Sequence, residues 1–232
     1  MISSPIVVKI RNFTRKLGLN KVIASFLASK EYEDKFGNAI SSQIKSGDTV
    51  WDIGANLGIY TEIFLNQVSV NGRVVTFEPA PSCFTVLQKK YTTNEQVTLK
   101  NIALGSQDDT LYMNIEENPL AATHKIVNTN SVANPTNLVE VKVCSPDSII
   151  ELEPELIPNV IKIDVEGFEG QVIDGMQNLL KQEKLRCIGI EVHFGLLNER
   201  GETNRPQQIE KTLKENNFIV FWTDSSHILA TR

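Results

Sequence analysis

The sequence predicts an α/β protein built on a mostly parallel β-sheet, and three features of the chain support this class. Short apolar runs typical of buried strands alternate with segments in which apolar residues recur at helical spacing. A turn with two glycines, at residues 54–58, joins the first apolar run to a helical segment. The strand and helix segments then alternate over residues 49–99, which requires crossover connections that are right-handed in nearly all proteins.

The N-terminal part of the chain, residues 1–46, is predicted to be a helical segment packed on the core, with residues 47–232 forming the main domain. Apolar residues repeat every four positions from Tyr32 to Ile44, which indicates one face of a helix. The first 30 residues carry six basic and no acidic side chains. That segment is either a packed helix with a solvated basic face or a helix that contacts a membrane surface or a partner.

In the main domain, the first half is predicted to contain three strands separated by two helices. The strands are expected at residues 50–53, 74–77 and 97–99. The apolar faces of the helices are expected to comprise Ile59, Ile63 and Phe64 in the first and Phe84, Leu87 and Tyr91 in the second.

The second half is predicted to continue the same alternation after an interruption. Strands are expected at residues 110–115, 138–143, 160–165 and 187–192, helices at 172–180 and 207–216, and a terminal hairpin at 218–230. The polar segment at about 116–137 is a long connection for a compact domain. It is either an insertion that covers the substrate side or a disordered surface loop.

Composition excludes several classes of protein. The net charge of −5 does not provide the basic field of a nucleic-acid binder, so no nucleic-acid partner is expected. No apolar run approaches the roughly 18 to 20 residues of a transmembrane helix, and no signal peptide is recognisable, so a cytoplasmic location is expected. Three widely spaced cysteines favour neither a disulfide framework nor a zinc site.

The glycine turn has the chemistry of a small-molecule site. A glycine lacks a Cβ and tolerates positive φ, so a ligand can approach the backbone at the N-terminus of the following helix. The turn does not fit the dinucleotide fingerprint, because the third and sixth positions counted from Gly54 are Asn56 and Ile59. Glu78 ends the next strand, where a carboxylate can accept hydrogen bonds from a ribose diol. The alternative is a tight strand-to-helix connection with no ligand.

Five motifs in order carry a resemblance to a known family. They read TVWDIGANLGIYT, VVTFEPAPSCF, NIALGS, IKIDVEGFEG and GIEVH, and they span the chain from about Thr49 to His193. Together they resemble the FkbM family of S-adenosylmethionine-dependent methyltransferases. The resemblance implies a Rossmann-like class I methyltransferase fold, with a seven-stranded sheet that is parallel except for an antiparallel last strand.

The resemblance also implies where the cofactor S-adenosylmethionine binds. Glu78 would hold the ribose, and Asn101 with Ala103 would contact the adenine. The residues implied around the methionine part are Asp52, Gly54, Asn56 and Gly58, and Ala55 is a further cofactor-binding residue.

Candidates for catalysis lie within the fourth and fifth motifs, at the carboxyl ends of two strands. His193 has an ordinary pKa near neutrality and is the first choice as proton acceptor; alternatively it only satisfies the end of a strand. Asp164 is a base, an orienter of His193, or a ligand of a divalent metal with Glu191 and His193. Glu166 is a third catalytic candidate.

Two further charged residues in these motifs have structural interpretations. Glu169, like Glu166, fits an acid in the first turn of a helix, where it complements the helix dipole. Lys162, inside a strand run, fits a partner of a carboxylate.

The resulting hypothesis is a methyltransferase that moves a methyl group from S-adenosylmethionine to a hydroxyl of a small molecule or glycan. A divalent metal is possible but is not predicted, and the oligomeric state is not determined. Two alternatives remain at this point. The first is a catalytically silent binding module with the same fold, which uses the basic N-terminal helix as its contact. The second is a nicotinamide-dependent oxidoreductase, which the missing glycines disfavour.

Overall fold

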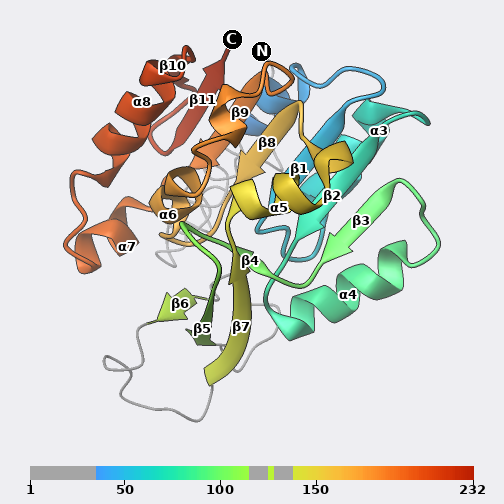
Figure 1. Ribbon diagram of the computed structural model, residues 1–232, viewed down its shortest axis with the longest axis horizontal. Helices are drawn as coiled ribbons and strands as arrows, with labels where there is room; N and C mark the ends of the chain where they lie inside the picture. Colours follow the sequence, from blue (N-terminus) through green and yellow to red (C-terminus); the bar gives the residue numbers. More distant parts are fainter. Residues whose placement is uncertain (1–34, 115–124, 128–137) are drawn as a thin grey trace, which may run out of the picture.

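The computed structural model describes residues 35–114, 125–127 and 138–232 of the chain. Its main sheet has seven strands in the order β10-β11-β9-β8-β1-β2-β3 (Figure 1). Neighbouring strands are parallel except at β11, which is antiparallel to both β9 and β10. The predicted sheet with an antiparallel last strand is confirmed. The strands are β1 (Thr49–Ile53), β2 (Arg73–Phe77), β3 (Val97–Lys100), β8 (Val160–Ile163), β9 (Cys187–Glu191), β10 (Ile219–Trp222) and β11 (His227–Thr231).

Helices cover both faces of this sheet (Figure 1). The helix of residues 35–41 packs with α3 on one face, and α5, α6 and α8 contribute to the core cluster on the other. Of the remaining helices, α4 packs against β3, and α7 follows β9 in the chain. The bounds of the labelled helices are α3 (Ile59–Val68), α4 (Pro81–Tyr91), α5 (Pro146–Leu152), α6 (Glu169–Asp174), α7 (Phe194–Glu199) and α8 (Arg205–Glu215).

The central strand β1 contributes side chains to the hydrophobic core on both faces of the sheet. All five of its residues are buried, and their side chains alternate between the two core clusters. Val50 belongs to the cluster under α3, whereas Trp51 and Ile53 belong to the cluster under α5 and α6. The Trp51 indole donates a 2.8 Å hydrogen bond to the carbonyl of Leu156, so its polar atom is satisfied inside the core. A parallel strand that is buried on both faces is typically apolar along its length; β1 fits this at Val50, Trp51 and Ile53, and Asp52 is its one charged residue.

The first crossover helix lies where the sequence predicts it, but it turns a different face to the core. α3 buries Thr61, Phe64 and Val68, whereas Ile59 is 69% exposed and Ile63 is also exposed. The predicted face of Ile59, Ile63 and Phe64 is therefore wrong for its first two members. The polar Thr61 takes their place because its hydroxyl donates a 2.6 Å hydrogen bond to the buried carboxylate of Asp52.

A smaller sheet lies beyond the carboxyl ends of β1, β2 and β8 (Figure 1). Its strands are β4 (Ala103–Leu104), β5 (Asp109–Asn114), β6 (Lys125–Val127) and β7 (Leu138–Cys144), in the order β4-β7-β5-β6. The sequence predicts β5 and β7 as strands but does not predict that they form a separate sheet. β6 falls within residues 116–137, which were expected to be a single connection without a strand.

Several predictions concern residues outside the described part of the chain. They include the helical pieces before residue 35 and the role of the basic N-terminal residues, as well as most of the proposed insertion at 116–137. Within the described ranges, Phe36, Ile40 and Ile44 are buried, as their four-residue spacing predicts. Among the helices in those same ranges, none has the length and apolar character that crossing a membrane requires.

Candidate functional site

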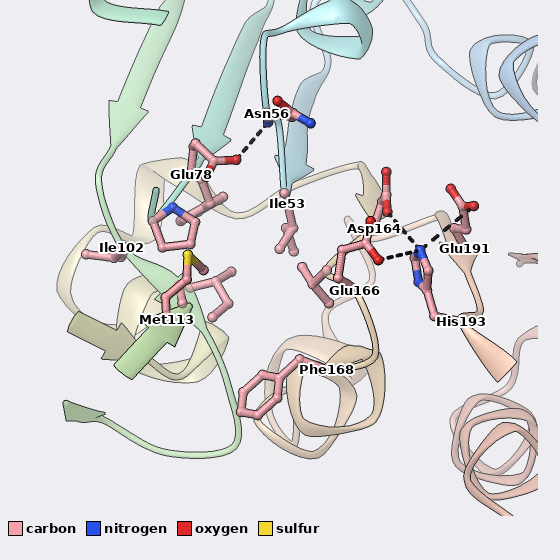
Figure 2. A pocket seen from close by; sticks show the side chains of 16 residues that line it. Ile53, Asn56, Glu78, Ile102, Met113, Asp164, Glu166, Phe168, Glu191 and His193 are labelled. Atoms are coloured by element: carbon pink, nitrogen blue, oxygen red, sulfur yellow. Dashed lines mark hydrogen bonds and ion pairs between the residues drawn. The ribbon is translucent and has the colours of Figure 1, made fainter. Parts of the chain in front are cut away.

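A cavity lies at the carboxyl ends of the central strands, between the main sheet and the smaller one (Figure 2). This is the edge at which open α/β sheets bind their ligands. Figure 2 shows Asn56 and Glu78 at one end of the cavity and the acidic residues with His193 at the other. The lining residues are Ile53, Gly54, Asn56, Phe77, Glu78, Pro79, Ile102, Ala103, Leu104, Met113, Asp164, Val165, Glu166, Phe168, Glu191 and His193.

The glycine turn between β1 and α3 depends on positive φ angles at Gly54, Asn56 and Gly58. A Cβ on Gly54 would lie 1.8 Å from the carbonyl oxygen of Asp164, and one on Gly58 would lie 2.7 Å from a methyl group of Leu87. The space beside each glycine is therefore filled by protein. The sequence interpretation, in which the glycines leave room for a ligand, is incomplete, because close packing already requires both of them.

Four of the five backbone N–H groups of this turn, at residues 54–58, are engaged within the protein. Gly54 and Ala55 donate to the carbonyl of Phe77, and Gly58 donates to Ala55. The N–H of Asn56 donates to Oε2 of Glu78 at 2.7 Å. The turn therefore positions Glu78 directly, and a ligand here meets a carboxylate more than free N–H groups.

Glu78 is a nearly buried carboxyl that lines the cavity. Its second oxygen accepts a 2.8 Å hydrogen bond from the N–H of Ala80, so both oxygens are fixed by backbone. Burial raises the pKa of the Glu78 carboxyl to about 7, although the N–H groups of Ala80 and Asn56 lower it. A carboxyl in this position can still accept further hydrogen bonds through its remaining lone pairs.

Four of the eight predicted cofactor residues line the cavity, namely Gly54, Asn56, Glu78 and Ala103. The other four, which are Asp52, Ala55, Gly58 and Asn101, do not.

Asp52 supports the turn from below the cavity. It is fully buried and accepts the hydrogen bond from Thr61 described above. Its other oxygen has no hydrogen-bond partner among the described residues and lies 3.6 Å from the Lys162 ammonium. Lys162 also donates to Asp164 at 3.1 Å and to the carbonyl of Gly54 at 3.3 Å. Lys162 is thus the carboxylate partner that the sequence predicts, and it joins the two ends of the site.

Asn101 also has a supporting position. Its side-chain amide donates to the carbonyls of Glu78 and Pro79, at 2.8 and 3.2 Å, and so fixes the chain where β2 ends. The neighbouring Ile102 lines the cavity in its place. Sequence reasoning also missed Met113 and Phe168, which add to the apolar wall. These residues come from the smaller sheet and the turn before α6, so no local pattern identifies them.

Four polar side chains converge at the opposite end of the cavity (Figure 2). The Nε2 atom of His193 lies 3.7 Å from Asp164, 3.4 Å from Glu166 and 3.9 Å from Glu191. The structure therefore brings together all three predicted catalytic residues. Glu166 has a φ of 50°, an uncommon backbone conformation for a residue with a side chain.

The other ring nitrogen of His193 contacts Glu169, which the sequence interpretation assigned to complementing a helix dipole. Nδ1 of His193 lies 2.6 Å from Oε1 of Glu169, which is fully buried at the start of α6. Glu169 is indeed in the first turn of a helix, but its main contact is this imidazole. His193 is the residue before α7, and its side chain makes no cap hydrogen bond to that helix.

The acids change the proton affinity of His193. Burial lowers the pKa of the imidazole, but the hydrogen bond to Glu169 and the charges of Glu169, Glu166 and Asp164 outweigh burial and raise that pKa to about 9. The imidazole therefore carries a proton at neutral pH in this arrangement. The argument that His193 accepts a proton because its ordinary pKa is near neutrality does not hold here.

The fold and the position of the cavity define a class of protein. A seven-stranded sheet of this order, with β11 antiparallel and a ligand cavity at the carboxyl edge, is the class I methyltransferase fold. Residues 52–220, well over half of the chain, match the methyltransferase FkbM domain. The chain belongs to this family of S-adenosylmethionine-dependent methyltransferases.

Known proteins are similar to this chain at low identity. Hexuronic acid methyltransferase AglP of Haloferax volcanii is 25% identical over 217 residues, covering 92% of this chain and 82% of AglP. The crystal structure of methyltransferase FkbM from Methylobacillus flagellatus KT has a TM-score of 0.52 at 16% identity. The match covers 80% of this chain and 44% of that protein, so the matched part spans less than half of its length.

A second structure covers nearly the whole chain. It comes from Staphylococcus aureus and is assigned provisionally as a caffeoyl-CoA O-methyltransferase. Its TM-score is 0.50 at 13% identity, with 95% of this chain and 99% of that chain covered. At these identities both solved structures bear on the fold alone.

Proposed function

We propose that the protein transfers the methyl group of S-adenosylmethionine to a hydroxyl group of a sugar or another small molecule. The observation that carries the proposal is one cavity with two chemically different ends. The carboxyl of Glu78, which we assign to the ribose, lies at one end, and an acid–histidine cluster lies at the other. A methyltransferase needs both, because the donor must be held in line with an acceptor whose proton has to leave.

On the donor side, we assign the ribose hydroxyls to Glu78 and the methionine part of the cofactor to Gly54 and Asn56. Ala103 would contact the adenine, together with the apolar side chain of Ile102. Asp52, Ala55, Gly58 and Asn101 would act indirectly, because their contacts hold the turn and the end of β2 in place.

On the acceptor side, we propose that Glu166 accepts the proton of the hydroxyl group. Asp164 is held by Lys162 at 3.1 Å, and Glu191 by His227 at 3.5 Å. Apart from His193, no basic side chain forms an ion pair with Glu166 among the described residues, and its carboxylate lines the cavity. Asp164 and His193 would then orient the acceptor oxygen.

The proposed step balances as follows. The acceptor oxygen forms a bond to the methyl carbon while the bond from that carbon to sulfur breaks, and its electron pair goes to the sulfur. The hydroxyl proton passes to Glu166. The products are a methylated oxygen and S-adenosylhomocysteine.

The acceptor class is supported by the relative from Haloferax volcanii, whose printed name is hexuronic acid methyltransferase. A sugar acid offers both hydroxyl and carboxylate oxygens. The carboxylates of Asp164, Glu166 and Glu191 would repel a second anion in the same space, so a hydroxyl oxygen is the better acceptor.

Two measurements test the proposal. Calorimetry with S-adenosylhomocysteine should detect one site, which Glu78→Gln weakens; a folded protein that gives no heat at millimolar ligand would contradict it. Incubation with S-adenosylmethionine and a panel of neutral sugars and hexuronic acids should then yield a product that is heavier by one methyl substitution. An alkali-stable ether supports the hydroxyl acceptor, whereas an alkali-labile ester identifies a carboxylate acceptor and overturns this part of the proposal.

A further inference from the structure

We propose that Asp164, Glu191 and His193 bind a divalent cation, and that this ion holds the acceptor oxygen beside the methyl donor. The binding site stands on geometry alone, whereas its role in methyl transfer rests on the proposed function. One donor atom from each of the three side chains lies within 4.8 Å of the other two. All three side chains line the cavity (Figure 2).

The distances between the donor atoms are those of ligands rather than of hydrogen-bond partners. Nε2 of His193 is 3.7 Å from Oδ1 of Asp164 and 3.9 Å from Oε1 of Glu191. A hydrogen bond would bring such atoms to about 2.7–3.2 Å. Donors around one ion lie roughly 3.0–3.8 Å apart when each bond to the ion is about 2.1–2.2 Å. The observed separations are close to that range.

Each carboxylate is held from behind by a buried basic side chain, through the oxygen that does not face His193. Lys162 contacts Oδ2 of Asp164 at 3.1 Å, which leaves Oδ1 toward the centre. His227 contacts Oε2 of Glu191 at 3.5 Å, which leaves Oε1 toward the centre. The side chains of Lys162 and His227 are both more than nine-tenths buried. Outer partners of this kind orient metal ligands and are a regular part of metal sites.

The imidazole of His193 is likewise oriented by a buried partner. Its Nδ1 is bound to the fully buried Glu169, so Nε2 is the nitrogen that faces the two carboxylates. A carboxylate behind a histidine fixes the ring and raises its basicity as a ligand. The other oxygen of Glu169 is buried and has no hydrogen-bond partner among the described residues. A bound ion would take the place of the proton on Nε2, so positive charge beside Glu169 is kept when the ion binds.

The donor set selects the kind of ion. Carboxylate oxygens suit Mg²⁺ and Mn²⁺, and an imidazole nitrogen favours the transition metal of the two. We therefore assign the site to Mn²⁺. Such ions take about six ligands, so three protein donors leave positions open for water and for the acceptor. An acceptor with two neighbouring hydroxyl oxygens, as in a sugar diol, could fill two of them.

Binding of Mn²⁺ to the purified protein, followed by electron paramagnetic resonance, tests the site directly. One ion per chain is expected. Asp164→Asn and Glu191→Gln should each weaken binding at least about tenfold, and Glu169→Gln should weaken it less because Glu169 acts through His193. The matched control is Glu95→Gln, an exposed acid before β3 at the opposite edge of the sheet, which should bind Mn²⁺ like the unchanged protein.

The outcomes are distinguishable from those of the methyl-transfer test. A folded protein that binds no Mn²⁺ at millimolar concentration, or an Asp164→Asn variant that binds it as Glu95→Gln does, overturns the site. Tighter binding of Zn²⁺ than of Mn²⁺ overturns the choice of ion. If Mn²⁺ binds but S-adenosylhomocysteine does not, the site stands and the proposed function fails. If both bind and chelation leaves turnover unchanged, the role of the ion in transfer is wrong.

Discussion

The two ends of the cavity are built on different principles. At the donor end, the Gly54–Gly58 turn and Glu78 are joined by backbone hydrogen bonds within one strand–helix–strand unit. At the acceptor end, side chains from two parallel strand ends and an antiparallel strand meet around His193. The donor end depends on backbone shape, whereas the acceptor end depends on the spacing of charges.

This difference predicts how a substitution at each end would affect the protein. A substitution of Gly54 disturbs the contact between β1 and β8, so it affects the whole sheet. A substitution of Glu166 or Glu191 changes the charge at a partly exposed edge of the sheet. It should therefore affect catalysis and leave the fold intact. Three predictions test this contrast.

The largest effect is expected for Gly54→Ala. The added Cβ would lie 1.8 Å from the Asp164 carbonyl oxygen at a φ of +78°, so the ends of β1 and β8 must separate. We expect a loss of about 3 kcal/mol or more in the free energy of unfolding, measured by urea denaturation. The control is Gly195→Ala, where no atom lies within 4 Å of the added Cβ, and stability should hold or rise. Equal free energies of unfolding for the two variants would contradict the packing argument.

The next effect is expected for Glu166→Gln. Removal of the proposed proton acceptor should lower kcat about 100-fold or more, because general base catalysis contributes roughly that factor. Affinity for S-adenosylhomocysteine and the unfolding midpoint should not change. Glu151→Gln, an exposed acid on α5, is the matched control and should retain full turnover. Full activity of Glu166→Gln would remove Glu166 from the mechanism.

The smallest effect concerns pH and the donor end. The pKa of Glu78 is raised to about 7, so the carboxyl is mostly protonated at pH 6 and mostly ionised at pH 8. A ribose diol donates to the ionised form, so affinity for S-adenosylhomocysteine should rise about tenfold between these values. Calorimetry across this range measures it. Glu78→Gln should bind more weakly and without this rise; an unchanged pH profile in that variant would assign the dependence to another group.

Much of the fold follows from local patterns. The strands around Val50, Val74 and Ile161 and the hairpin from Ile219 to Thr231 are where the sequence predicts them, because buried strands and hairpin turns have short-range signatures. The helix after Gly58 is also predicted, but its buried face is not. Its face is decided by the pairing of Thr61 with Asp52, which a hydrophobic pattern does not contain.

The candidate site was predictable to a different degree at each end. Glu78 is recognisable because a strand end after a glycine turn is a local feature. The contact between Glu169 and His193, which joins residues 24 positions apart, has no such signal. It reverses the expected proton state of the imidazole, because a pKa depends on neighbours in space.

By itself, the sequence determined the α/β class, the Gly54–Gly58 turn and the acids at the strand ends, because these depend on the order and spacing of residues along the chain. The tertiary structure decided which acids share a site. Ile163 pairs with Ile190, which aligns Asp164 with Glu191, and β11 pairs His227 with Glu191. Strand register is set by packing of the whole sheet, so only the folded protein converts these separate side chains into one cluster around His193.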